Sequence, residues 1–166
     1  MSADVGMFKA GMRRLAGGVT LVTTLWNGER GGLTATAVCS VSAEPPQLLA
    51  CVNKTASAHD LIVQSGIFCI NLLGTQHIEL AGRFSGQHGV EGDERFGQGE
   101  WRRLSTGAPV LPDALASFDC RTARQIEASS HTIFIGHIVD IAVAPGRPLI
   151  HADGGFLTGA HAAAAL

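Results

Sequence analysis

The stretch Val19-Thr20-Leu21-Val22-Thr23-Thr24-Leu25, followed by Asn27-Gly28, indicates how this chain folds. β-Branched residues favour an extended strand, and an Asn-Gly pair after such a run is the strongest short-range signal for a β-hairpin. A return strand follows, and the segment Val38-Cys39-Ser40-Val41-Ser42 then alternates along a further strand until Pro45-Pro46 ends it. This part of the sequence therefore predicts antiparallel strands.

The rest of the chain has many short strands and few helices. Residues 85–100 combine glycines with charged residues and predict a loop. Strands and helices do not alternate regularly, which disfavours a doubly wound sheet. We therefore predict a mainly β fold, an antiparallel barrel with helical decoration. The predicted strands are 47–52, 67–73, 116–126 and 132–143, with a short piece at 149–150, and the predicted helices are 3–16, 57–64 and 76–81.

Length and composition indicate one domain that associates with a copy of itself. The chain has 166 residues, so we predict a single domain over 1–166 with flexible ends at 1–6 and 160–166. Charged residues make up only 16% of the chain, against about 25% in typical soluble domains. So few charged side chains cover a monomer poorly, which predicts a homodimer.

Charge and hydropathy narrow the list of expected partners. The net charge is −2 and the basic residues are scattered, so we expect no nucleic acid partner. No apolar run approaches the roughly 20 residues that cross a bilayer, and charges interrupt residues 1–18, so we predict a cytoplasmic protein without a membrane partner. The cysteines at 39, 51, 69 and 120 form no CxxC pair and are predicted to be buried free thiols.

The sequence lacks the motifs of several common classes of nucleotide-binding proteins, hydrolases and metalloenzymes. It has no P-loop, no GxSxG nucleophile elbow and no GxGxxG after a strand, so a nicotinamide nucleotide would bind without a Rossmann unit. No HExxH pair occurs, and His131 and His137 would lie about 20 Å apart on one strand at ~3.3 Å per residue. We therefore predict no metal site.

Two segments have the chemistry of a nucleotide site. Small residues dominate Gly32-Leu33-Thr34-Ala35-Thr36-Ala37, where they would let a flat ligand approach the backbone, although a solvated sheet face has the same composition. Asn53-Lys54-Thr55-Ala56-Ser57 opens a helix, and free N–H groups, hydroxyls and a lysine favour a phosphate there; an ordinary capped helix start is the alternative. The guanidinium of Arg83 could hold a second phosphate oxygen.

In their order along the chain these motifs resemble the flavin reductase family with the split-barrel FMN-binding fold, the small components of two-component flavin monooxygenases. The resemblance covers nearly the whole chain, from about Phe8 to Phe156, and it implies a split antiparallel β-barrel of Greek-key type. Besides the two segments above, it rests on Gly17-Gly18-Val19-Thr20-Leu21-Val22-Thr23-Thr24, Pro45-Pro46-Gln47-Leu48-Leu49, Phe68-Cys69-Ile70-Asn71-Leu72-Leu73, Gly82-Arg83-Phe84-Ser85-Gly86 and Ser130-His131-Thr132-Ile133-Phe134-Ile135-Gly136.

The resemblance implies a role for each candidate residue. His131 matches a histidine at the nicotinamide side of the flavin, and we expect it to position the donor rather than to act as an essential acid. His151 stands where relatives often carry a tyrosine. The resemblance implies that Thr34, Ala35, Thr36 and Ala37 line the isoalloxazine ring, that Ser40 and Ser42 meet the ribityl chain or ring edge, that Asn53, Lys54, Thr55 and Ser57 hold the phosphate and ribityl groups, and that Arg83 and Phe84 reach the phosphate end.

The function implied is hydride transfer from NADH or NADPH to FMN or FAD, with the reduced flavin passed to a partner monooxygenase. In this chemistry the cofactors react while the protein supplies orientation and electrostatics. Two alternatives stay open at this point. One is a reductase that keeps FMN and passes electrons to another acceptor, such as a corrin; the other is a non-catalytic sensor that binds flavin or haem.

Overall fold

The first half of the chain forms the hairpins that the sequence predicts. The computed structural model describes residues 3–157. The turn residues Asn27 and Gly28 have φ of 49° and 86°, the left-handed values that a two-residue hairpin turn requires. This confirms the predicted hairpin. The elements in this half are α1 (Val5–Arg13), β1 (Gly17–Gly18), β2 (Thr20–Trp26), β3 (Glu29–Ala35), β4 (Val38–Ala43) and β5 (Pro46–Asn53).

The second half adds two long strands and short helices. The segment predicted as a loop over 85–100 contains the 3₁₀ helix η2 (Gly92–Gly97). The remaining elements are α2 (Ala58–Ser65), β6 (Ile67–Leu72), the 3₁₀ turn η1 (Thr75–His77), α3 (Ile78–Phe84), β7 (Arg102–Arg103), β8 (Pro109–Val110), β9 (Ala116–Ala128), β10 (His131–Val143), β11 (Ile150–Ala152) and β12 (Gly155–Leu157).

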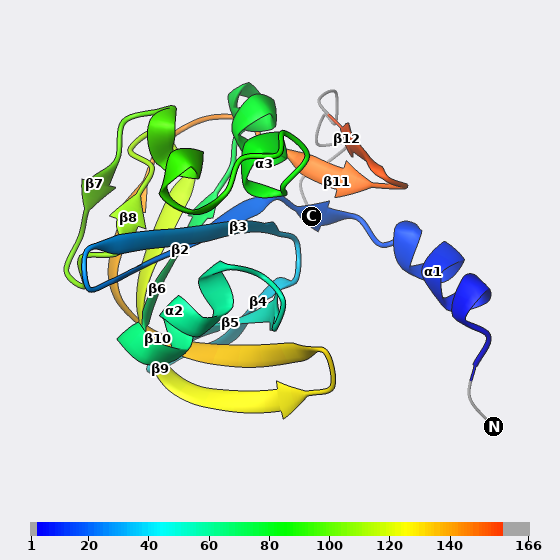
Figure 1. Cartoon of the computed structure of the whole chain (residues 1–166), viewed down its shortest axis with the longest axis horizontal. Helices are drawn as coiled ribbons and strands as arrows, with labels where there is room; N and C mark the ends of the chain where they lie inside the picture. Colours follow the sequence, from blue (N-terminus) through cyan, green and yellow to red (C-terminus); the bar gives the residue numbers. More distant parts are fainter. Residues whose placement is uncertain (1–2, 158–166) are drawn as a thin grey trace.

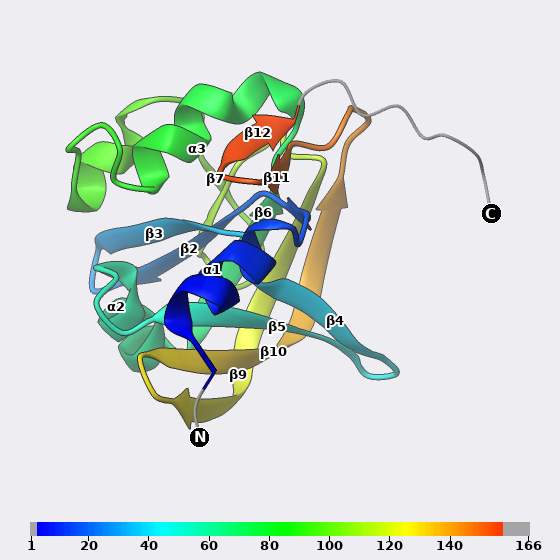
Figure 2. The same cartoon turned by 90° about the vertical axis from the view of Figure 1, so that its right-hand side faces the viewer.

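Seven strands form one antiparallel sheet in the order β3-β2-β6-β9-β10-β5-β4. Its first and last strands, β3 and β4, are consecutive in the chain and are joined by Thr36-Ala37. The amide of Cys51 on β5 donates to the carbonyl oxygen of Ala37 at 2.9 Å. The sheet therefore curves round on itself, with α3 above it and α1 standing off to one side (Figures 1 and 2). The prediction of a mainly β split barrel is confirmed.

The core has two large clusters, one inside the barrel and another beneath α3. Phe68 and Phe134 are fully buried in the barrel cluster. Gly136 lies against Phe68, and a Cβ there would meet Phe68 Cζ at 2.6 Å, so the strand needs a glycine at this point. The second cluster contains Val19, Leu21, Leu73, Leu80, Ala81, Phe84, Phe96, Leu111, Ala114 and Leu149.

The first helix, α1, is joined by a hydrogen bond to the turn between β11 and β12. Asp4 caps the helix by accepting a hydrogen bond from the amide of Met7 at 2.8 Å, and the amide of Asp153 donates to the carbonyl oxygen of Arg13 at 2.7 Å. The predicted flexible segments 1–6 and 160–166 fall outside the described residues at 1–2 and throughout 160–166. Within residues 3–157, no helix has both the length and the apolar character needed to span a membrane.

Candidate functional site

The Thr36-Ala37 corner, where β3 passes into β4, lies at the meeting point of two hollows. Both residues are exposed. An apolar hollow of about 570 Å³ opens between the barrel strands, and a second of about 550 Å³ lies between α1 and the barrel. The two share Leu15, Ala16, Gly17, Thr36 and Ala37 as lining residues. We call them together the corner groove.

The walls of the corner groove differ in character. On the barrel side they are apolar, from Leu49, Ile70, Leu72 and Phe118. On the α1 side they combine Phe8, Met12 and Leu15 with the basic Lys9 and Arg13, and His151 lies opposite them. Such a groove can hold a flat apolar ring at one end and an anion at the other. Hollows of this size are typical of small-molecule sites.

The structure brings only part of the predicted ring-binding segment to this groove. Thr36 and Ala37 line it. The hydroxyl of Thr34 instead donates to the carbonyl oxygen of Ala81 at 2.7 Å and ties β3 to α3. Ala35 is half-buried and packs against the barrel core. Of the four residues predicted to line the ring, Thr36 and Ala37 therefore line the groove, whereas Thr34 and Ala35 hold β3 in place.

Ser40 and Ser42 line a smaller hollow of about 230 Å³ along β4. It shares Val38, Cys39 and Phe118 with the apolar part of the corner groove. The Ser42 hydroxyl accepts a hydrogen bond from the amide of Glu44 at 3.2 Å. The two serines therefore lie beside the groove, at the edge of the sheet.

The residues Asn53-Lys54-Thr55-Ala56-Ser57 form an exposed turn, which we call the 53–57 turn. The side-chain oxygen of Asn53 accepts hydrogen bonds from both the amide and the hydroxyl of Thr55 at 3.0 Å. Ser57 occupies the N-cap position of α2, but its hydroxyl makes no capping bond. Lys54 pairs with Glu127. The turn presents hydroxyls and a lysine at a helix start, as the sequence predicts, yet it does not line the corner groove.

The two candidate histidines lie in different places. His131 pairs directly with Asn53 across β10 and β5, and its Nδ1 lies 2.9 Å from the hydroxyl of Ser130. The structure therefore places His131 beside the 53–57 turn. His151 pairs with Gly17, lines the groove and stands edge-on to Phe156 with 5.7 Å between ring centroids.

Arg83 and Phe84 are engaged elsewhere. The guanidinium of Arg83 donates to the carbonyl oxygens of Arg95, at 3.0 Å, and Glu94. Phe84 is 1% exposed and packs against Phe96 with ring centroids 5.0 Å apart. The prediction that the Phe84 side chain reaches a phosphate is wrong, because the core encloses it. Arg83 holds the loop beside α3 and lines neither part of the groove.

Burial separates the cysteines into two pairs. Cys69 and Cys120 are buried, and burial raises the pKa of the Cys120 thiol to about 12, so it stays protonated at neutral pH. Cys39 is exposed and Cys51 half-buried, and both line the apolar part of the groove. The prediction of four buried thiols is therefore wrong for Cys39, because β4 is an edge strand. Within residues 3–157, no three potential ligand side chains gather as a metal site would require.

Sequence reasoning missed the contribution of α1. The apolar residues Val5, Phe8, Met12 and Leu15 predict a helix packed on a core, but no residue of α1 is buried. Lys9 and Arg13 stand four residues apart on the helix and both line the groove. The only available signal was this spacing, since residues at i and i+4 share a helix face.

A split antiparallel barrel with a small-residue corner and an apolar groove defines the class of split-barrel flavin-binding proteins. Comparison with known proteins makes the assignment specific. The model of the family "Flavin reductase like domain" matches residues 12–160. The chain belongs to this family.

Curated relatives include an NADH-dependent FMN reductase RutF of Methylorubrum populi, 45% identical over 141 residues, which cover 85% of this chain and 69% of the relative. RutF 1 of Methylorubrum extorquens strain PA1 is 47% identical, over 80% of this chain and 65% of the relative. The chain thus spans about two thirds of the length of these relatives.

Solved structures agree with the family assignment. The flavin reductase PheA2 superposes with a TM-score of 0.87 at 32% identity, covering 96% of this chain and 100% of that one. BorF, the flavin reductase component of a bacterial two-component tryptophan halogenase, gives 0.84 at 29%, over 93% and 97% of the two chains. The NADH:FAD oxidoreductase SgcE6 of Streptomyces globisporus, in complex with NAD and FAD fragments, gives 0.86 at 28%, over 97% and 96%.

Proposed function

We propose that this chain is an NADH-dependent flavin reductase whose corner groove holds the isoalloxazine ring of FMN or FAD. The observation that carries the proposal is the meeting of an apolar hollow with the exposed Thr36-Ala37 corner, where small side chains leave backbone groups accessible. The names of the RutF relatives and of SgcE6 support NADH as the donor.

The residues of the groove suit a flavin. Leu49, Ile70 and Phe118 give the ring an apolar wall, and the small corner residues let polar backbone groups approach its edge. Ser40 and Ser42 are proposed to meet the ribityl chain, and the 53–57 turn is proposed to bind the phosphate. A bound flavin supplies the hydride acceptor, and the protein supplies orientation and a dry environment.

His131 is proposed to position the nicotinamide donor. Its pairing with Asn53 places it beside the 53–57 turn, so it also stands close to the proposed phosphate site of the flavin. His131→Ala should therefore raise the KM for NADH more than it lowers kcat. A complete loss of turnover at unchanged KM would contradict a positioning role, and an increase confined to the KM for FMN would assign His131 to the flavin phosphate.

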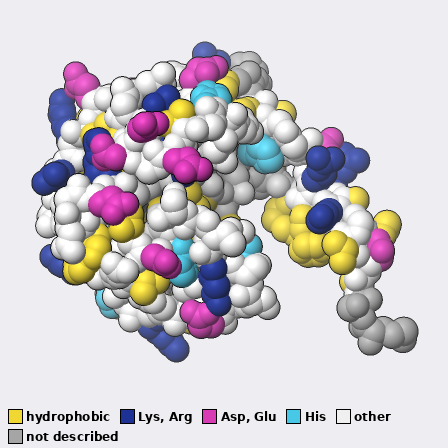
Figure 3. All heavy atoms as spheres, viewed as in Figure 1, with side chains coloured by type: hydrophobic (Ala, Val, Ile, Leu, Met, Phe, Trp, Pro, Cys, Tyr) yellow, Lys and Arg dark blue, Asp and Glu magenta, His cyan; other side chains and the backbone are white. Residues whose placement is uncertain are grey.

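A homodimer is proposed because, within residues 3–157, no residue of α1 is buried in one copy. Phe8 is 61% exposed and Leu15 68%, and Figure 3 shows hydrophobic side chains gathered on α1 where it projects from the body. Isolated helices shorter than about 12–15 residues are marginal in water, and α1 has 9. Sedimentation should give twice the chain mass, and Leu15→Glu should lower it. A wild-type monomer at micromolar concentration would contradict this proposal.

The wider role proposed is supply of reduced flavin to a partner monooxygenase. BorF, a reductase component of a two-component halogenase, supports release of reduced flavin to a second protein. A cytoplasmic location is supported by the free state of all four cysteines, since reducing compartments keep thiols unpaired.

The experiment that tests the function is anaerobic stopped flow, mixing protein and FMN with NADH and following the loss of oxidised-flavin absorbance. Repeating it with FAD and with NADPH ranks the four combinations. We expect rapid bleaching with NADH. Bleaching of flavin that stays bound to the protein would favour a flavoprotein that serves another acceptor, such as a corrin. Bound flavin that neither nucleotide reduces would favour a sensor.

A further inference from the structure

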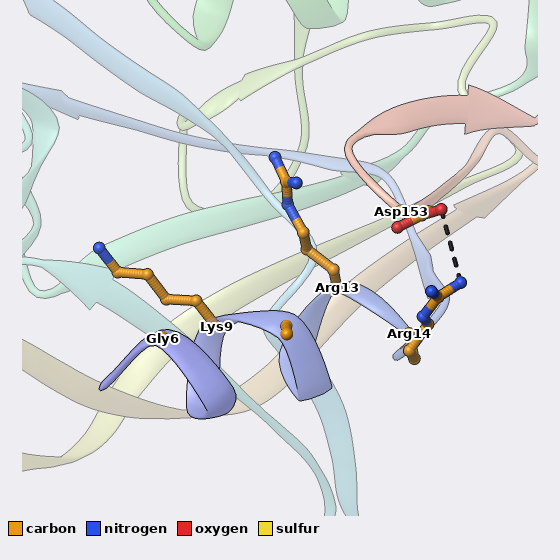
Figure 4. A pocket seen from close by; sticks show the side chains of 6 residues that line it. Gly6, Lys9, Arg13, Arg14 and Asp153 are labelled. Atoms are coloured by element: carbon orange, nitrogen blue, oxygen red, sulfur yellow. Dashed lines mark ion pairs between the residues drawn. The ribbon is translucent and has the colours of Figure 1, made fainter. Parts of the chain in front are cut away.

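Two basic side chains of α1 face the corner groove. Lys9 and Arg13 lie one helical turn apart and line the hollow that Thr36, Ala37 and His151 line from the barrel side. Both also line an adjoining hollow of about 460 Å³ along the helix. Figure 4 shows their side chains extending from the same side of α1, whereas Arg14 turns away toward Asp153.

The charges of Lys9 and Arg13 are not compensated by neighbouring groups. Arg14 pairs with Asp153 at 3.6 Å, which neutralises the one carboxylate in the lining. Asp4 faces the helix start, where it accepts from the amide of Met7. Within residues 3–157, no carboxylate forms an ion pair with Lys9 or Arg13. This wall of the groove therefore attracts an anion.

We propose that Lys9 and Arg13 bind the diphosphate of the nicotinamide dinucleotide, and so determine its affinity. The proposal rests on the proposed function and names the donor side of the same site. Side chains at i and i+4 stand about 6 Å apart at their Cβ atoms, so two cations can contact the two phosphate groups of one dinucleotide together.

A diphosphate fits this position better than the single phosphate of FMN does. The 53–57 turn, with Lys54 and the Ser57 hydroxyl that makes no capping bond, is a separate place for one phosphate, and it shares no lining residue with the hollow at α1. The hollow at α1 adjoins the corner where the flavin ring is proposed to lie. A donor whose nicotinamide stacks on that ring would extend its diphosphate toward α1.

The test compares Lys9→Met, Arg13→Met and the double variant with Arg102→Met. Arg102 lies exposed on β7, across the barrel from α1 in Figure 1, and its replacement removes the same charge. Because an exposed ion pair contributes at most about 1 kcal/mol, we expect the KM for NADH to rise about fivefold in each single variant, and further in the double variant. The kcat and the KM for FMN should stay at wild-type values, and Arg102→Met should change nothing.

Two further probes separate this proposal from the proposed function. Reduced nicotinamide mononucleotide lacks the diphosphate bridge, so its KM should be the same in all variants. Titration calorimetry with ADP-ribose, which carries the diphosphate but no nicotinamide, should show binding to the wild type and weaker binding to Lys9→Met and Arg13→Met, whether or not the protein turns over. If the wild type fails to reduce flavin yet binds ADP-ribose through these residues, only the proposed function is wrong.

Three outcomes would overturn the inference. One is an unchanged KM for NADH in the double variant. Another is an equal rise with the mononucleotide donor, which would place the effect at the nicotinamide end. The third is a rise in the KM for FMN alone, which would assign Lys9 and Arg13 to the flavin phosphate.

Discussion

Two arginine-bearing sides of the barrel have opposite characters. On one side, which we call the closed side, α3 and the loop with η2 cover β3. The arginines there donate hydrogen bonds to main-chain carbonyl oxygens. Arg83 donates to Arg95, and Arg95 donates to Gly32 and to Val90, each at 2.9 Å. On the other, the open side, α1 faces the Thr36-Ala37 corner across a groove and buries none of its residues.

The difference shows that the main-chain carbonyls around an arginine decide whether its guanidinium stabilises the fold or stays able to bind a ligand. On the closed side each guanidinium is satisfied within the fold, because the loop bends its carbonyl oxygens toward it. On the open side Lys9 and Arg13 face a hollow, and within residues 3–157 neither of them forms an ion pair. Stability should therefore depend on the closed side and nucleotide affinity on the open side.

The largest expected effect is at Gly32 on the closed side. A Cβ there would meet Phe84 Cε1 at 2.5 Å and Cδ1 at 2.9 Å, and the ring is enclosed by the core. Gly32→Ala should lower the free energy of unfolding by about 2–3 kcal/mol, as measured by urea denaturation at fixed protein concentration. The matched control is Gly155→Ala beside the open side, where nothing lies within 4 Å of the new Cβ. Equal stabilities of the two variants would break the comparison.

A smaller loss is expected for Arg95→Met. This change removes the hydrogen bonds to the Gly32 and Val90 carbonyls and should cost about 1–2 kcal/mol of stability. The KM values for NADH and flavin should not change, in contrast to Arg13→Met on the open side. A raised KM with wild-type stability would show that the closed side belongs to the site.

The rate at which each cysteine reacts with a thiol reagent tests whether a ligand binds in the corner groove. At neutral pH, Ellman's reagent should label Cys39 and Cys51 in the native protein, while Cys69 and Cys120 react only after unfolding. Burial raises the pKa of the Cys69 and Cys120 thiols, so their thiolate fractions are negligible below the raised values. FMN should slow the labelling of Cys51, which lines the groove. Peptide mapping identifies the labelled sites, and labelling of Cys51 at the same rate with and without FMN would place the flavin elsewhere.

The smallest effect is expected at Gly11 in α1. A Cβ there has no neighbour within 4 Å, and alanine favours a helix over glycine by up to about 1 kcal/mol. Gly11→Ala should slow amide exchange in α1 without changing exchange in the barrel strands. Slower exchange throughout the barrel would mean that α1 and the barrel unfold as one unit, and the two sides would then not be independent.

The sequence predicted most of the strands and a barrel, but not which strands pair to close that barrel. The run 19–25 and Asn27-Gly28 carry local signals, since β-branched residues and hairpin turns act on their own neighbours. That β3 and β4 form opposite ends of one sheet depends on β10, which pairs with β9 on one side and, on the other, with β5 from much earlier in the chain. No local pattern encodes such pairing.

The sequence could predict those parts of the candidate site that are formed by residues consecutive in the chain. The Thr36-Ala37 corner and the 53–57 turn are visible as small and hydroxyl-rich segments. Phe84 and Thr34 were assigned to a ligand because the sequence does not reveal that Phe96 and Ala81 face them. Lys9 and Arg13 were missed because the opposite wall of their hollow comes from His151 and Gly154, near the other end of the chain.

The two-residue link between β3 and β4 has a consequence for how such a protein can be redesigned. Thr36-Ala37 joins the two ends of the sheet order and also forms the floor of the groove. An insertion there would alter the register of β4 on β5, so the length of this link cannot change without disturbing the barrel. The wall formed by α1 is held to the rest of the fold through few contacts, such as the Asp153–Arg13 hydrogen bond. A graft of another first helix is therefore expected to change the affinity for the donor, through the proposed role of Lys9 and Arg13, while leaving the barrel and the proposed ring site intact.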